Sequence, residues 1–200
     1  MTTLLKINAS ISADQGQSGR LADQFVAAYR VRHPDVSVQV RDVAGGAIPH
    51  LDGERFGAFI TPPGERSAAQ HAVIAYSDSL IDELKRADVI VIGLPMYNFG
   101  VPSQLKAYFD HVARAGVTFR YEAAGPVGLL TGKKAYVFAT RGGFYAGTPM
   151  DTQTGYVRDF LRFIGIADVQ FVYAEGLAVS AQSKEAGLAK AAADIARLAA

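Results

Sequence analysis

The residues best suited to hold a ligand lie at 94–102, in the segment Leu-Pro-Met-Tyr-Asn-Phe-Gly-Val-Pro. Its aromatic rings can stack on a flat ligand, the amide of Asn98 can donate and accept hydrogen bonds at a ring edge, and its prolines stiffen the backbone. The apolar run 88–93 predicts a buried strand before it, and helical spacing follows over 103–114. Open α/β sheets bind ligands at such loops. The alternative is an ordinary turn whose rings cover the core.

A second loop, residues 9–18, is rich in hydroxyls, contains Gly16 and leads into a helix with Leu21 and Phe25 on one face. Ser18 is expected to be the N-cap of that helix. Free N–H groups and the helix dipole make such a start suitable for a phosphate, although Ser18 could serve as a cap alone. The loop matches no known nucleotide fingerprint. It misses the nucleophile elbow by one position, so a serine hydrolase is only a weak alternative.

A third loop, Thr140-Arg141-Gly142-Gly143, follows the apolar run 135–139. Glycines let backbone N–H groups approach a ligand closely, although a Gly-Gly pair more commonly makes a plain turn. All three loops follow predicted strands.

The pattern of the whole chain predicts how these loops are positioned. Strands are expected at 3–8, 36–40, 88–93, 135–139 and 169–173, and helices alternate with them. This predicts a three-layer αβα fold with a five-stranded parallel sheet. The second and fifth strands alternate in polarity, as edge strands do, so the order 2-1-3-4-5 fits. Residues 42–66 are expected to form a long loop, and residues 115–132 an irregular stretch with a short hairpin.

The composition indicates a protein that acts on small molecules. The chain has 200 residues, which we interpret as a single domain over residues 1–200, and its formal net charge is +1. Without a basic or acidic block, no nucleic acid or membrane partner is expected. There is no cysteine, so redox chemistry would require a cofactor. The scattered histidines predict no metal site, and the N-terminus resembles no leader, so a cytoplasmic location is expected.

In the predicted strand order, the three loops meet at one edge of the sheet. A phosphate loop, an aromatic loop with an amide and a glycine turn together match the parts of flavin mononucleotide (FMN). The sequence therefore predicts an FMN site.

The segments 95–99, 104–110, 113–121, 131–134 and 141–143 resemble those of the bacterial FMN-dependent NADH:azoreductase family, and the likeness extends over essentially the whole chain. The resemblance implies a flavodoxin-like homodimer with one FMN per subunit near the interface. It also implies an NAD(P)H-dependent enzyme that reduces quinones and aromatic azo compounds, with NADH or NADPH as the electron donor. Because a flavin can accept and pass on hydride at one atom, we expect ping-pong kinetics and no catalytic side chain beyond a supporting Asn98.

Carried over by position, the resemblance implies a set of FMN contacts and three aromatic walls of the substrate pocket. The FMN contacts are Ser10, Gly16, Gln17, Ser18, Met96, Tyr97, Asn98, Phe99, Thr140, Arg141, Gly142 and Gly143. The aromatic walls are Phe59, Tyr121 and Phe163. Thr140 and Gly16 stand where the family pattern usually has serine, and the segment 144–148 departs from that pattern.

Two other classes share this topology. A flavodoxin-type electron carrier would bind FMN without oxidising a nicotinamide, but such carriers tend to be acidic and this chain is nearly neutral. A receiver module would need an acidic cluster after the first strand, and residues 9–12 contain no acid.

Overall fold

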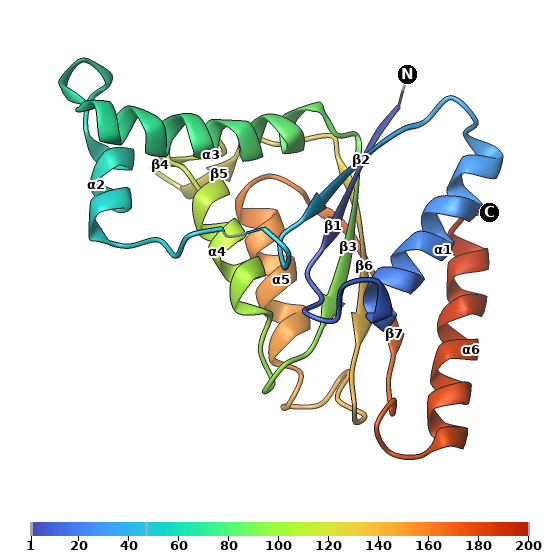
Figure 1. The fold of residues 1–200 in the computed structure, drawn as a ribbon. Coiled ribbons are helices and arrows are strands. Elements are labelled where there is room, and N and C mark those ends of the chain that lie inside the picture. Colours follow the sequence, from blue (N-terminus) through green and yellow to red (C-terminus); the bar gives the residue numbers. More distant parts are fainter. Residues whose placement is uncertain (1, 47, 200) are drawn as a thin grey trace.

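The fold is built on a five-stranded parallel sheet. The structure is a computed structural model and describes residues 2–46 and 48–199. The strands of this sheet are β1 (Thr3–Asn8), β2 (Ser37–Asp42), β3 (Val89–Pro95), β6 (Lys134–Thr140) and β7 (Asp168–Ala174). Their order is β2-β1-β3-β6-β7, and every neighbouring pair is parallel (Figure 1).

The predicted order 2-1-3-4-5 differs from the observed order in its numbering. Two short strands, β4 (Phe119–Glu122) and β5 (Gly125–Gly128), come between β3 and β6 in the sequence. They pair antiparallel as a hairpin outside the main sheet. The fourth and fifth strands of the main sheet are therefore β6 and β7. The strands with alternating polarity, β2 and β7, are its edges, and β3 is buried along its whole length.

Helices cover both faces of the sheet. One face carries α1 (Gln17–Arg32) and α6 (Ala181–Leu198), and the other carries α3 (Ala68–Arg86), α4 (Ser103–Val112) and α5 (Thr152–Phe163) (Figure 1). Because successive side chains of a strand point to opposite faces, Ile90 and Ile92 pack under α3 to α5, whereas Val89 and Val91 pack under α1 and α6. Within the described ranges, no helix is long and apolar enough to cross a membrane.

The prediction of a long loop over 42–66 is wrong in part, because this stretch contains the helix α2 (Gly53–Ile60). Asp52 caps the helix, and its carboxylate accepts a hydrogen bond from the backbone N–H of Arg55 at 2.8 Å. The helix has two turns and lies between glycine and proline residues, which hide its pattern. With the start of α3 it forms an end that projects beyond the sheet (Figure 1). At the start of α3, Ser67 and Gln70 form a capping box, in which each side chain accepts a hydrogen bond from the backbone N–H of the other residue.

Candidate functional site

The loops after β1, β3 and β6 come together at the carboxyl edge of the sheet, because these three strands are neighbours. The hydroxyl of Tyr97 bridges two of them: it accepts a hydrogen bond from the backbone N–H of Ile11 at 3.2 Å and lies 3.4 Å from the hydroxyl of Ser10. The backbone N–H of Met96 donates to the carbonyl of Thr140 at 3.0 Å, which joins the third loop. The predicted meeting of the three loops is confirmed.

Ser18 is not the N-cap of α1, and that prediction is wrong. The cap position is occupied by Gly16, so Ser18 lies in the first turn. Its side chain is buried, and its hydroxyl has no hydrogen-bond partner among the described residues. Leaving a buried hydroxyl unpaired costs about 1–3 kcal/mol. An anion at the positive end of the α1 dipole would satisfy this hydroxyl, so the loop fits a phosphate group.

The glycine at position 16 is required by its neighbour. A Cβ at Gly16 would lie 2.2 Å from the hydroxyl oxygen of Ser10 and 2.6 Å from its Cβ. Ser10 is itself buried, and its hydroxyl accepts a hydrogen bond from the backbone N–H of Ser12 at 3.2 Å. The side chain of Ser10 therefore occupies the space that a serine at position 16 would need. Two serines cannot share this space in the conformation seen here.

The second loop is a tight hairpin turn with a left-handed backbone. Tyr97 and Gly100 exchange two backbone hydrogen bonds, of 3.2 and 2.9 Å. Between them, Asn98 has φ 49° and Phe99 has φ 62°. Two consecutive residues at positive φ are typical of a type I′ turn, in which glycine or asparagine is preferred. A left-handed phenylalanine costs on the order of 1–3 kcal/mol, so the surrounding structure must hold the turn.

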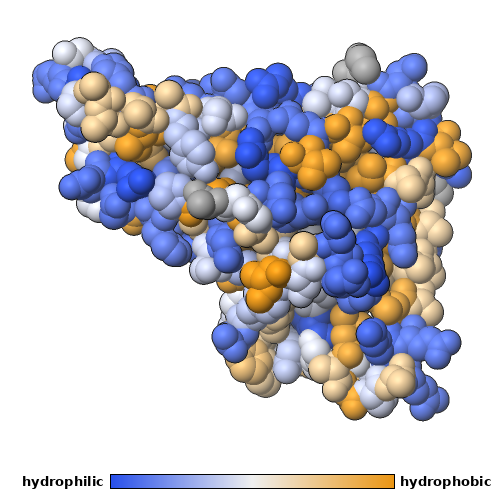
Figure 2. Space-filling view, in the orientation of Figure 1, coloured by the Kyte–Doolittle hydropathy of each residue, from blue (hydrophilic) through white to orange (hydrophobic). Residues whose placement is uncertain are grey.

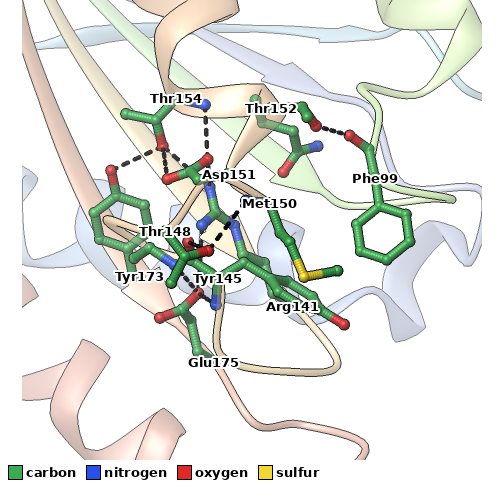
Figure 3. A network of polar contacts seen from close by, with 12 residues as sticks. Phe99, Arg141, Tyr145, Thr148, Met150, Asp151, Thr152, Thr154, Tyr173 and Glu175 are labelled. Carbon is green, nitrogen blue, oxygen red and sulfur yellow. Dashed lines mark hydrogen bonds and ion pairs between the residues drawn. The ribbon is translucent and has the colours of Figure 1, made fainter.

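Residues at the start of α5 hold this turn. The buried amide of Gln153 donates to the carbonyl of Pro95 at 3.0 Å and to that of Gly100 at 2.9 Å. The hydroxyl of Thr152 donates to the carbonyl of Phe99 (Figure 3). Sequence reasoning missed both residues, because nothing in a helix start more than fifty positions away points to the turn.

The side chain of Arg141 is fully buried and turned into the protein rather than toward a ligand (Figure 3). Its guanidinium forms ion pairs with Asp151 at 2.6 Å and Glu175 at 3.3 Å, and lies 5.0 Å from the ring centre of Tyr173. Burial opposes the charged form of Asp151, but hydrogen bonds from Arg141 and Thr154 hold the pKa of Asp151 below its ordinary value. Both terminal nitrogens of the guanidinium are therefore already paired inside the protein.

A small pocket opens between the loops that follow β3 and β6. Its volume is about 230 Å³, and it is lined by Met96, Asn98, Phe99, Gly142 and Tyr145. Four of these residues were predicted as contacts, and Tyr145 was missed. The sequence could have indicated Tyr145, because its aromatic ring follows the Gly142-Gly143 pair by two positions and that pair was already predicted to contact a ligand. The rings of Phe99 and Tyr145 meet edge to face, 5.4 Å apart.

The three predicted aromatic walls lie elsewhere in the chain. Phe163 ends α5, at the far end from the residues that hold the turn, and a twelve-residue helix is about 18 Å long. It packs on Phe119, which in turn contacts Tyr121. Phe59 lies in α2, and the guanidinium carbon of Arg114 lies 5.5 Å from the centre of the Phe59 ring. One chain therefore does not bring these three rings to the pocket.

Two other cavities, of about 230 and 590 Å³, lie between α2 and α3. Arg55 lines both, and its guanidinium is already paired with the carboxylate of Asp52 at 2.8 Å. Neither cavity touches the carboxyl edge of the sheet, so we place the functional site at the three loops.

Comparisons with known proteins agree with this architecture. Residues 2–199 match a family model described as the flavodoxin-like fold. The chain is 55% identical over 191 residues to an FMN-dependent NADH:quinone oxidoreductase of Burkholderia pseudomallei (strain 1710b), covering 96% of each protein. It is 54% identical to a protein of the same name from Cellvibrio japonicus (strain Ueda107), covering 88% of this chain and 89% of that one.

Solved structures show the same similarity. The azoreductase from Bacillus anthracis str. Sterne superposes with a TM-score of 0.91 at 27% identity, covering 100% of this chain and 99% of that one. An FMN-dependent NADH-azoreductase from Bacillus anthracis str. Ames Ancestor, in complex with FMN, gives a TM-score of 0.87 at 26% identity over the whole of both chains. The predicted resemblance is confirmed: the chain belongs to the family of FMN-dependent NADH:quinone oxidoreductases and has the flavodoxin-like fold.

Proposed function

We propose that this protein, as a single domain, is an FMN-dependent oxidoreductase that takes two electrons from NADH and passes them to quinones and aromatic azo compounds. The names of the relatives support the general reaction. The observation that carries the proposal is that the start of α1 with its buried Ser18 hydroxyl, a left-handed aromatic turn and a glycine pair meet at one edge of the sheet. Each supplies what a different part of FMN needs.

The residues divide into a phosphate end and a ring end. The phosphate would be held by the loop of Ser10 and by the first turn of α1, with Gly16, Gln17 and Ser18. The hydroxyl of Ser18 would gain a partner that none of the described residues provides. The ring system would lie against the loops of Met96, Tyr97, Asn98 and Phe99 and of Thr140, Gly142 and Gly143. Arg141 would act only by fixing the third loop, since its guanidinium is bound inside the protein.

When bound, FMN supplies the two-electron chemistry, so no side chain of the protein need act as a nucleophile. The protein's task is to hold each substrate ring in place and to keep water out. The amide of Asn98 would present a hydrogen-bond donor where negative charge develops on reduction. The left-handed turn fixes the backbone that carries this amide.

We propose that the active species is a homodimer. The pocket of one chain, about 230 Å³, is smaller than the roughly 300–1,000 Å³ typical of ligand sites. The molecular outline in Figure 2 is indented between the projecting α2 end and the loop edge. Exposed apolar side chains lie on α2, at Phe56 and Ile60, and on β4, at Tyr121. A second copy seated there would bring its own Phe59, Tyr121 and Phe163 to the pocket as the missing walls.

The decisive experiment is a steady-state study of the purified protein with FMN. The protein should bind FMN, and NADH should bleach the oxidised flavin absorbance. Because the pocket is small, NADH and the acceptor should use it in turn, so a grid of NADH and quinone concentrations should give parallel double-reciprocal lines. Intersecting lines would contradict the shared site. Failure to bind FMN would contradict the whole proposal, and FMN binding without reduction by NADH would favour an electron carrier.

A further inference from the structure

The aromatic ring of Tyr145 occupies a position that the proposed reaction does not yet explain. We infer that Tyr145 determines which ring-shaped substrates the pocket accepts, and that Glu175 is the positioning residue that holds Tyr145 there. The inference rests on the proposed function and deepens it, because it assigns substrate choice to one side chain of the segment 144–148.

The ring of Tyr145 is confined on two sides. It meets the ring of Phe99 edge to face, with an interplanar angle of 65°. On the other side it lies over the backbone of Gly143, where an added Cβ would come within 2.7 Å of the tyrosine ring. It lines the pocket together with Asn98. Tyr145 therefore forms a side wall against which the edge of a substrate ring would pack.

A single carboxylate oxygen fixes this part of the loop. Oε1 of Glu175 accepts hydrogen bonds from the backbone N–H groups of Tyr145 and Ala146, both at 2.8 Å. The same oxygen lies 3.3 Å from the guanidinium of Arg141 (Figure 3). Hydrogen bonds to an ionised acceptor are stronger than those between neutral groups. Glu175 directly follows the end of β7, so a rigid strand carries the oxygen that orients Tyr145.

The neighbouring ring takes no part in the pocket. The backbone N–H of Gly176 donates to the carbonyl of Gly143 at 2.9 Å. Gly176 has φ 70°, and a Cβ there would come within 2.5 Å of the ring of Phe144. Phe144 thus lies against Gly176, is 63% exposed, and does not line the pocket. The two adjacent aromatic side chains provide a matched pair for an experiment.

The first test compares Tyr145→Ala with Phe144→Ala. Loss of the Tyr145 wall should raise the KM for a two-ring naphthoquinone by about fivefold to tenfold, with kcat changed less than about twofold. The KM for a one-ring benzoquinone should change less, because a smaller ring reaches less of the wall. Tyr145→Phe, which keeps the ring, should recover the low KM. Phe144→Ala should leave the naphthoquinone KM within about twofold. An equal rise in Phe144→Ala would overturn the assignment to Tyr145.

The second test concerns Glu175. Glu175→Gln should speed hydrogen exchange at the amides of Tyr145 and Ala146, and it should raise the naphthoquinone KM in the same direction as Tyr145→Ala. The double variant should be no worse than Tyr145→Ala alone, because Glu175 acts through that ring. Additive losses, or unchanged exchange, would refute the positioning role. If Glu175→Gln does not fold, Tyr145→Ala still tests whether the Tyr145 ring selects the substrate, since this variant alters only a half-buried loop side chain.

The two proposals fail in different ways. A wild-type protein that neither binds FMN nor oxidises NADH refutes the proposed function. An active wild-type protein whose Tyr145→Ala variant keeps the same ratio of kcat/KM between the two quinones refutes only the inference drawn here.

Discussion

At the scale of single residues, the hydroxyl of Ser18 is the group that the proposed phosphate site would satisfy. A serine that capped its own helix would be satisfied by the protein, but this one is buried and finds no partner among residues 2–46 and 48–199. Such a group destabilises the folded chain and is compensated only when something binds it. The same hydroxyl should therefore lower the free energy of unfolding of the free protein and increase its affinity for a phosphate.

Replacing Ser18 by alanine should separate these two effects. Ser18→Ala loses a hydrogen bond to a charged group, about 1.5–3 kcal/mol, so FMN should bind about ten- to a hundredfold more weakly. The free energy of unfolding without FMN should stay the same or rise. Fluorescence titration and urea unfolding measure the two quantities. Ser12→Ala, on the exposed part of the same loop, is the control. Equal FMN affinity in Ser18→Ala and wild type would exclude a phosphate contact.

At the scale of elements, α5 links the sheet edge to the turn that carries Asn98. Its first residues hold the strained backbone of the turn, and its last residues lie at the opposite end of the sheet. One helix thus connects the pocket of its own chain with the ring of Phe163, which the homodimer would place at the pocket of the other chain.

Removing the amide of Gln153 should weaken the turn. Gln153→Leu leaves the carbonyls of Pro95 and Gly100 without their side-chain donor, which should cost about 1–3 kcal/mol of unfolding free energy. FMN affinity should fall too, because the turn must then be ordered when FMN binds. Chemical unfolding and FMN titration test this. Lys190→Leu, on the exposed side of α6, controls for the change in polarity. Unchanged FMN affinity in Gln153→Leu would show that the turn keeps its conformation without the hydrogen bonds from Gln153.

The sequence predicted the elements whose pattern is local. Apolar runs marked the buried strands, and alternation marked β2 and β7 as edges. The pattern failed at α2, which is too short for its periodicity to show. It also gave no indication of where the side chain of Arg141 points, because that direction is set by Asp151 and Glu175, ten and 34 positions away. Spacing along the chain carries no signal for such a contact.

At the scale of the whole molecule, the buried ion pairs of Arg141 couple three segments, since they join the end of β6 to the start of α5 and the end of β7. Among these three groups, the carboxyl of Asp151 makes stability depend on pH. The dependence follows from the lowered pKa of Asp151.

Acid should unfold the protein partly through Asp151. The stabilisation from its carboxylate is fully present above its unfolded pKa, about 3.9, and is lost as pH falls through the lower pKa of the folded state. Asp151→Asn should therefore lower stability at neutral pH and flatten its loss below about pH 4. Unfolding midpoints at several pH values test this. A variant with the same acid dependence as wild type would contradict the role of Asp151.

A shared pocket predicts complementation between subunits. Ser18→Asp should abolish FMN binding in its own chain, and Tyr121→Asp should spoil the wall offered to the partner. Each variant should have low activity alone. Mixed and re-equilibrated, half the dimers should be hybrids with one intact site, which restores about a quarter of the sites. No recovery, in a mixture shown to exchange subunits, would contradict the shared pocket.

The left-handed turn at Asn98 and Phe99 has a chemical consequence. Its backbone angles are those that mirror-image amino acids prefer. A semisynthetic protein with D-asparagine and D-phenylalanine at these positions should adopt the turn without strain, while its side chains leave the backbone in different directions. Such a protein should be more stable to heat than the all-L chain yet reduce quinones poorly. In the natural chain both residues adopt this unfavourable handedness, and both line the pocket.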